Sequence, residues 1–192
     1  RLVGGLDSVP VLAALVLKPE TTDAARFALE RIPGSEAEQA LLAVLDKSQG
    51  AMKRGLVFSL GERKSSAAVP ALEKLAGGKD LSLAADAVKD LGKIGGPEAI
   101  RVLTAMLGKA SPQLKLEAAS ALLLAAENDP GAAAIYDKLF AADLPPVMRQ
   151  AAFKGKIEAA GDGGKGLILK ALAGKDAVLF APAIAMVPAN FG

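Results

Sequence analysis

Apolar side chains return at helical spacing along most of this chain. Val69, Leu72 and Leu75 follow one another at steps of three residues, and the segment 81–91 continues with steps of three and four. Residues three and four apart lie on one face of an α-helix. No stretch shows sustained alternation rich in Val, Ile, Thr and aromatic residues, as half-buried strands do. The pattern predicts helices with one apolar face each and no β-sheet.

The helical pattern itself repeats about every 30 residues, in one column of large apolar residues and one of small residues. The large column is formed by Leu12, Leu42, Leu72, Leu103, Tyr136 and Leu167. The small column is formed by Ala25, Gly55, Ala85, Ala118, Ala151 and Ala181, at steps of 30 to 33 residues. The distance between packed helices depends on the side chains at the contact. We therefore expect the small column to lie at the seams between stacked helices.

The repeat predicts a single array over residues 1–192, made of six helix pairs. The units cover approximately residues 6–34, 35–64, 65–95, 96–129, 130–161 and 162–192. The predicted helices span 8–17 and 21–32, 36–47 and 50–60, 66–76 and 81–93, 97–108 and 112–127, 131–141 and 146–159, and 164–173 and 176–187. Local signals support these boundaries, because Ser35–Glu38 has the sequence of a capping box and Ser111 precedes a proline at a first helical position.

Two segments in the middle of the chain carry a family resemblance. The sequence Val-Pro-Ala-Leu-Glu-Lys-Leu at 69–75, followed by Leu-Ala-Ala-Asp-Ala-Val-Lys-Asp-Leu-Gly-Lys-Ile-Gly at 83–95, resembles one HEAT repeat. It is most similar to the short HEAT-like repeats of bacteria, which also occur in phycobilisome-lyase-type proteins. The resemblance implies an all-α, right-handed superhelix of the HEAT/armadillo type, built from antiparallel helix pairs with the second helices on the concave side. It also implies a protein-interaction scaffold.

Composition narrows the chemistry that the chain can perform. The 192 residues include no Cys and no His, and the formal net charge is +2. Thiol chemistry, His general bases and Cys/His metal sites are therefore excluded.

Both ends look like interior repeats, so we expect a soluble fragment of a longer protein, with no signal or transmembrane segment in this stretch. The other domains of that protein are expected partners, and the sequence does not give a compartment.

The remaining motifs do not indicate an enzyme, and the sequence predicts no cofactor and no metal ion. Gly161–Gly166 reads GxGxxG, but a dinucleotide site needs this motif between a strand and a helix. Here it joins two predicted helices, so we interpret it as a loop. The carboxylates considered for acid–base work are Glu73, Asp86, Asp90, Glu98 and Glu117. We expect them on solvated helix surfaces among Lys and Arg residues.

The expected function is binding of a protein or peptide partner on the concave face of the solenoid. The candidate contact residues on the second helices are Lys53, Arg54, Val57, Lys89, Met148, Arg149, Phe153 and Lys156. Phe27 and Phe180, on the same set of helices, are expected in the core. Two alternatives stay open. One is a nucleic-acid-binding array with a basic concave groove, which the interleaved acidic residues and few aromatics disfavour. The other is an inert structural spacer.

Overall fold

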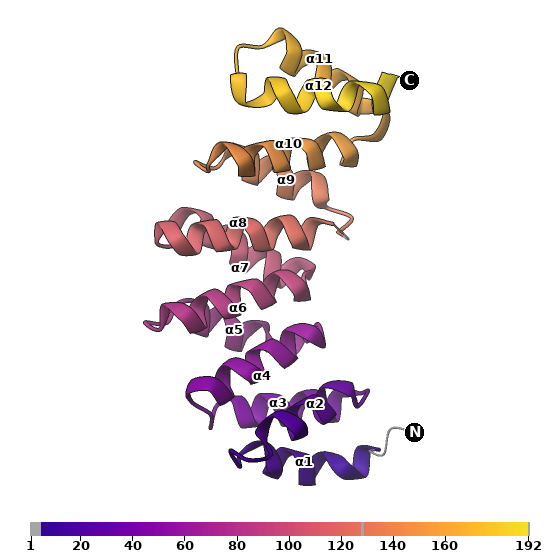
Figure 1. Ribbon diagram of the computed structural model, residues 1–192. Helices are drawn as coiled ribbons and strands as arrows, with labels where there is room; N and C mark the ends of the chain where they lie inside the picture. The colour runs from indigo at the N-terminus through magenta and orange to yellow at the C-terminus, as the bar shows by residue number, and fades with distance from the viewer. Residues whose placement is uncertain (1–4, 128, 192) are drawn as a thin grey trace. The chain divides into compact units, whose positions relative to one another are not determined.

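The computed structural model describes residues 5–127 and 129–191, and these residues form twelve α-helices and no strand (Figure 1). The first six helices are α1 (Val9–Val16), α2 (Thr22–Arg31), α3 (Ser35–Leu45), α4 (Gly50–Glu62), α5 (Val69–Ala76) and α6 (Leu81–Ile94). The other six are α7 (Gly96–Lys109), α8 (Pro112–Ala126), α9 (Ala132–Ala141), α10 (Pro146–Ala159), α11 (Gly164–Ala173) and α12 (Ala177–Phe191). The predicted all-α architecture of packed helix pairs is confirmed.

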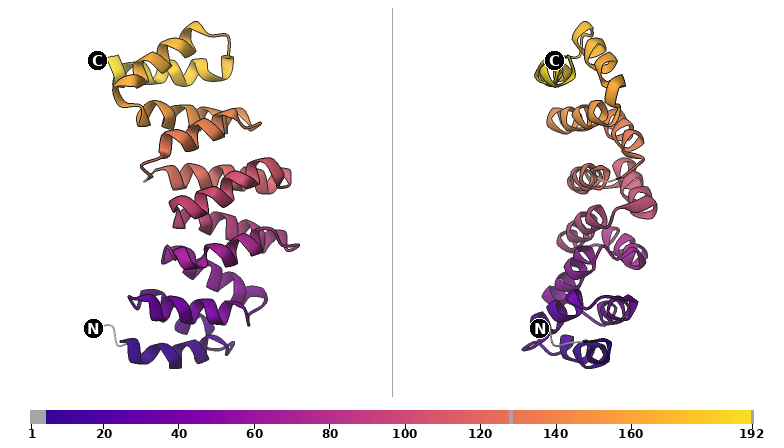
Figure 2. Two further views of the ribbon diagram at one scale, coloured as in Figure 1. Left: turned by 180° about the vertical axis from the view of Figure 1, so that it is seen from behind. Right: turned by 90° about the vertical axis from the view of Figure 1, so that its right-hand side faces the viewer.

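The chain divides into two compact units, residues 1–99 and residues 100–192, and the boundary falls inside α7. In unit 1, α1 packs on α2, α3 on α4 and α5 on α6. The second helices also pack on one another, because α4 contacts both α2 and α6. In unit 2, α10 contacts α9, α11 and α12. The order of helices within each unit can be followed in both views of Figure 2.

The large apolar column forms the core in the middle of the chain and slips near its ends. Leu72 and Leu103 are fully buried, whereas Leu12 and Leu42 are only half-buried. Their places in the core of unit 1 are taken by the neighbouring Val16 and Leu41. Burying a Leu or Val side chain stabilises a fold by about 1.5–3 kcal/mol. The core therefore follows the actual helix orientation and not a fixed repeat length.

The small column is only partly at the seams. Ala25 and Ala118 are buried and Ala85 is half-buried, but Ala151 and Ala181 face solvent, which contradicts the predicted packing position. In α10 the buried small residues are Ala152 and Gly155. One residue along a helix is a rotation of about 100°. A period read from the middle of the chain therefore points to the wrong face at position 151.

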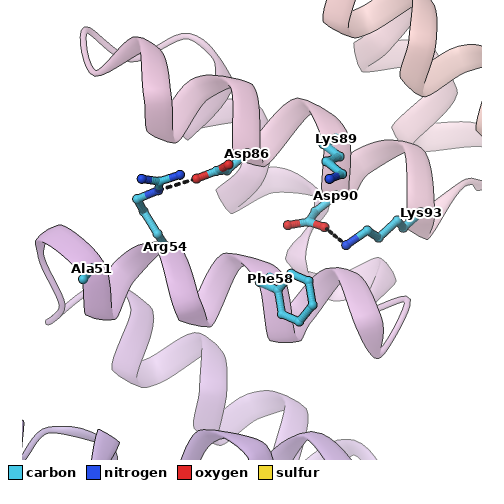
Figure 3. A pocket seen from close by; sticks show the side chains of 7 residues that line it. All are labelled: Ala51, Arg54, Phe58, Asp86, Lys89, Asp90 and Lys93. Atoms are coloured by element: carbon cyan, nitrogen blue, oxygen red, sulfur yellow. Dashed lines mark hydrogen bonds and ion pairs between the residues drawn. The ribbon is translucent and has the colours of Figure 1, made fainter. Parts of the chain in front are cut away.

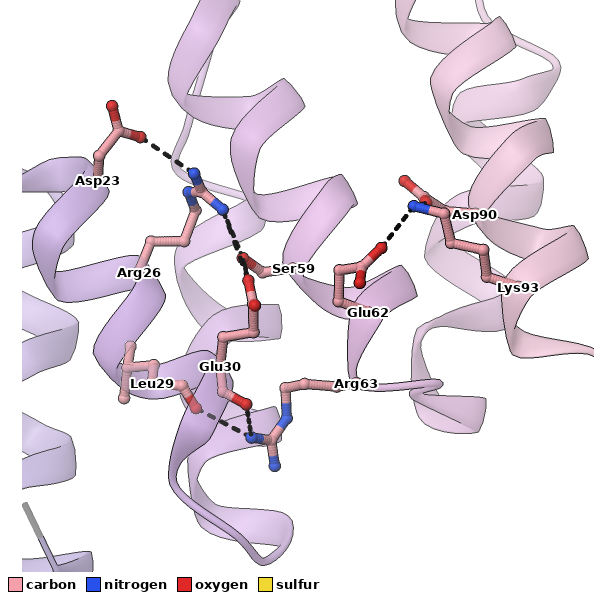
Figure 4. Close-up of polar contacts among 9 residues, drawn as sticks. All are labelled: Asp23, Arg26, Leu29, Glu30, Ser59, Glu62, Arg63, Asp90 and Lys93. Atoms are coloured by element: carbon pink, nitrogen blue, oxygen red, sulfur yellow. Dashed lines mark hydrogen bonds and ion pairs between the residues drawn. The ribbon is translucent and has the colours of Figure 1, made fainter. Parts of the chain in front are cut away.

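Gly55 of α4 leaves room for the side chain of Arg26 from the neighbouring helix α2. A Cβ at Gly55 of α4 would lie 2.9 Å from Nε of Arg26 on α2. That arginine is buried, and it donates a hydrogen bond to Ser59 at 2.7 Å. Ser59 in turn donates to Glu30 at 2.8 Å (Figure 4). Gly55 thus permits a polar network between α2 and α4.

A second arginine closes the end of α2. The guanidinium of Arg63, just beyond α4, donates to the backbone carbonyls of Leu29 and Glu30 at 2.9 Å (Figure 4). It also donates to Ile32 at 2.6 Å and to Gly34 at 2.8 Å. The last carbonyls of a helix lack partners within the helix, and they carry the negative end of its dipole. Arg63 therefore ties the helix pair α3–α4 to the C-terminus of α2.

The predicted helix caps are formed at one site and not at another. Ser111 accepts a hydrogen bond from the N–H of Leu114 at 3.5 Å, as expected. The capping box at Ser35 is not formed, because α3 begins at Ser35 and its N-cap is Gly34. The carboxylate of Glu38 instead accepts a hydrogen bond from the hydroxyl of Ser65. Ser65 belongs to the next predicted repeat, residues 65–95. This hydrogen bond therefore joins two neighbouring repeats within unit 1 and does not cap a helix.

Asp80 caps the N-terminus of α6. Its carboxylate accepts hydrogen bonds from the N–H groups of Ser82 and Leu83, both at 3.1 Å. Loss of such a cap costs about 1 kcal/mol. We expect Asp80→Ala to lower the free energy of unfolding by about this amount in chemical denaturation, and Asp80→Asn to recover most of it. An unchanged stability in the alanine variant would contradict this role.

Candidate groove between α4 and α6

A groove of about 360 Å³ lies where α4 and α6 pack in unit 1 (Figure 3). It is lined on α4 by Ala51, Arg54 and Phe58, and on α6 by Asp86, Lys89, Asp90 and Lys93. These positions follow one another at helical steps of one, three or four residues. Each set therefore occupies one face of its helix. The groove is thus formed by the faces that two consecutive second helices turn toward each other.

The floor of the groove holds a buried carboxylate. Asp90 is 3% exposed, and its Oδ1 lies 2.7 Å from Nζ of Lys93 on the next turn of α6. The same ammonium donates to Glu62 at the end of α4 at 2.8 Å (Figure 4). Burial raises the pKa of Asp90 to about 6, although the ion pair with Lys93 works in the opposite direction. Burial lowers the pKa of Lys93, but its two carboxylate partners outweigh this and leave it raised.

Gly61 explains how a carboxylate can be buried at this position. A Cβ at Gly61 of α4 would lie 2.5 Å from Cγ of Asp90 and 2.7 Å from its Cβ. Real side chains do not approach so closely, and only a glycine leaves this space free. The absence of a side chain on α4 therefore creates the space that Asp90 occupies.

The walls of the groove present one exposed aromatic ring and one unpaired cation. Phe58 is 43% exposed, and Nζ of Lys93 lies 4.4 Å from the centre of its ring. Arg54 donates to Asp86 at 2.5 Å, and this hydrogen bond raises the pKa of the arginine. Lys89 is exposed and makes no ion pair within the part of the chain that the structure describes. The groove therefore offers Phe58 for apolar contact and Lys89 for an anion.

The structure brings two of the sequence-predicted contact residues of unit 1 into this groove and corrects a third. Arg54 and Lys89 line it, while Lys53 lies half-buried outside the lining. Val57 is fully buried, so it cannot contact a partner from the surface. The face of α4 that carries Ala51 and Arg54 continues with Phe58, seven residues after Ala51. Val57 is rotated from that face into the core.

The four predicted residues of unit 2 do not form an exposed patch. Phe153 is 5% exposed and belongs to the core cluster with Ile157 and Ile168, so its predicted exposure is wrong. Met148 and Arg149 are half-buried. Arg149 donates to Asp176 at 2.7 Å. Lys156 forms an ion pair with Asp137.

Other sequence-based expectations are also revised. Phe27 and Phe180, expected in the core, are 38% and 47% exposed. The guanidinium of Arg26 covers one face of the Phe27 ring at 4.2 Å. Asp90, expected on a solvated surface, is buried. Phe58 was not among the predicted residues, because the spacing within α4 does not decide whether Val57 or Phe58 faces α6.

The groove has features of a binding surface and lacks those of a metal site. Within residues 5–127 and 129–191, no group of three or more Asp and Glu side chains is placed to hold a metal ion.

The GxGxxG segment runs through a short 3₁₀ turn at Gly161–Gly163 into α11, with no strand in the described part of unit 2. No helix among the described residues has the length and apolar character needed to cross a membrane.

Comparison with known protein families finds a match over the middle of the chain. A family model described as HEAT repeats matches residues 38–123, which extends from α3 into α8. No curated protein matches the sequence. The groove residues from Ala51 to Lys93 all lie within the matched segment.

Proposed function

We propose that the protein binds another protein through the groove between α4 and α6, because residues 38–123 match a family model described as HEAT repeats. HEAT repeats are commonly protein-interaction scaffolds. The observation that carries the proposal for this groove is Phe58, an aromatic side chain left 43% exposed on a surface formed by two packed helices. Aromatic residues are enriched in protein interfaces, where a few side chains carry most of the binding energy.

The charges of the groove favour a partner segment that carries an apolar anchor next to an acidic residue. The anchor would pack on Phe58, and the acidic side chain would pair with Lys89. The other two basic groups are already engaged, because Arg54 pairs with Asp86 and Lys93 with Asp90 and Glu62. Lys89 is therefore the cation that a partner can pair with at no cost to an existing ion pair.

The same ion pairs argue against a nucleic acid in this groove. A nucleic-acid surface needs several basic side chains free to neutralise phosphates. Here two of the three basic residues of the lining hold carboxylates of the same unit. The lining contributes three positive and two negative side chains, so it has no strong positive excess. A protein segment with one acidic residue fits this balance better.

The proposal is tested by comparing groove variants with matched controls in the same unit. The full chain is used to capture proteins from an extract of its source, and each captured protein is titrated calorimetrically. We expect Phe58→Ala and Lys89→Glu each to weaken the interaction, Phe58→Ala by at least about tenfold. Leu81→Ala and Lys79→Glu, at exposed positions outside the groove, should bind as the parent does.

Two results would contradict the proposal. One is a partner whose affinity is the same for the groove variants and the parent, which would place binding on another surface. The other is that the chain, used at saturating concentration, captures no protein from the extract. That outcome would favour the spacer alternative.

A further inference from the structure

Unit 2 contains a cavity of about 230 Å³ that the proposed function does not use. Its apolar wall comes from four helices, with Phe140 on α9, Phe153 on α10, Leu167 on α11 and Leu179 on α12. The two phenylalanine rings are 6.3 Å apart between centres and tilted by 40°. A volume of this size has room for one aromatic ring.

The mouth of the same cavity carries a surplus of positive charge. Three lysines line it, namely Lys156, Lys170 and Lys175, together with the single carboxylate of Asp176. Asp176 is held by Arg149 at 2.7 Å. Lys170 and Lys175 are exposed and make no ion pair with the residues that the structure describes in this unit. Two unpaired ammonium groups therefore stand beside an apolar cavity.

We propose that this cavity binds a small organic carboxylate whose apolar body is about the size of one aromatic ring. The ring would lie against Phe153 and Leu167, and the carboxylate would pair with Lys170 and Lys175 at the mouth. Ligand sites of this kind are mostly apolar with a few polar groups that fix the orientation. A volume of about 230 Å³ leaves no room for a large cofactor. This site lies within unit 2 and does not depend on the groove of unit 1.

The probe for the test is 3-phenylpropanoate, and its uncharged amide serves as the matched ligand. Binding is followed by the methyl NMR signals of the full chain, in which Leu167 and Leu179 report on the cavity. We expect the carboxylate to shift these signals and to bind more tightly than the amide. We also expect added salt to weaken the binding, because the mouth is open to solvent and exposed charges are screened.

Variants separate the charge from the cavity. Replacing both Lys170 and Lys175 by Gln should weaken binding of the carboxylate about three- to tenfold and leave the amide unaffected, since exposed ion pairs are individually weak. Ala171→Leu, which adds bulk to the cavity wall, should abolish binding of both ligands. Lys138→Gln, at an exposed position of α9 outside the cavity, should bind both ligands as the parent does.

The proposal is overturned if millimolar 3-phenylpropanoate leaves both leucine signals in place. It is also overturned if the amide binds as tightly as the carboxylate, or if the double Gln variant binds the carboxylate like the parent. The lysine variants alter only exposed side chains, so this result can be obtained even if Ala171→Leu fails to fold.

Discussion

Alanine in place of Gly61 is expected to lower the free energy of unfolding of unit 1 by about 2–3 kcal/mol. The new methyl group would lie 2.5 Å from Cγ of Asp90, deep between α4 and α6. Asp90 is buried and paired with Lys93, so it cannot swing away without leaving a buried charge unpaired. Inside a helix, alanine is otherwise favoured over glycine by about 1 kcal/mol, so the steric effect must exceed that gain.

The matched control is Gly108→Ala in α7. A Cβ at Gly108 would meet no atom within 4 Å, so only the helix propensity should change there. We expect this variant to be slightly more stable than the parent. Chemical denaturation followed by circular dichroism gives both values, and hydrogen exchange of the α4 and α6 peptides localises the loss in Gly61→Ala to the groove.

A double-mutant cycle tests whether Asp90 is the cause. The three atoms nearest to the added Cβ all belong to Asp90, so Asp90→Gly removes the obstacle. Gly61→Ala should then be neutral or stabilising in the Asp90→Gly background. A Gly61→Ala penalty of the same size in both backgrounds would show that the two positions are not coupled. In that case our explanation of the buried carboxylate would be wrong.

The sequence predicted the helices well because the signals for them are local. Apolar spacing and glycine, proline and capping residues lie within each segment, and every predicted helix is found within about four residues of its expected bounds. The buried Asp90 and Arg26 were not predictable in this way. Each is buried because a glycine on the facing helix leaves space for it, Gly61 for the first and Gly55 for the second.

The candidate site was predicted only in part for a related reason. Spacing placed Arg54 and Lys89 on the second helices and in the groove. The choice between Val57 and Phe58, however, depends on a rotation of about 100° around the axis of α4. That rotation is set by the packing of α4 on both α2 and α6, which lie about one repeat away on either side in the sequence. A pattern within one helix does not contain this information.

The second large effect is a dependence of stability on pH between about 4 and 6, which Asp90 should cause. Its carboxyl ordinarily has a pKa of 3.8, and burial in the fold raises this pKa to about 6. Within this window the folded protein binds more protons than the unfolded chain, so the free energy of unfolding falls as pH rises. A difference of about two pKa units corresponds to about 3 kcal/mol. The contribution of Asp90 is thus largest below pH 4 and lost above pH 6.

Asp90→Asn isolates this effect, because the amide has nearly the shape of the carboxyl and does not titrate. We expect the variant to be more stable than the parent at pH 7, by about 1–3 kcal/mol, and the difference to disappear near pH 4. The other charged groups that face Asp90, namely Lys93, Glu62 and Asp86, are present in both proteins, so their shared titration largely cancels in the comparison.

Asp86→Asn, in the exposed pair with Arg54, serves as the control and should follow the parent across the same range. Chemical denaturation at pH steps from 4 to 7.5 measures all three proteins. If parent and Asp90→Asn run in parallel over that range, Asp90 does not take up its proton in the folded groove near pH 6, and the buried ion pair with Lys93 holds it ionised throughout.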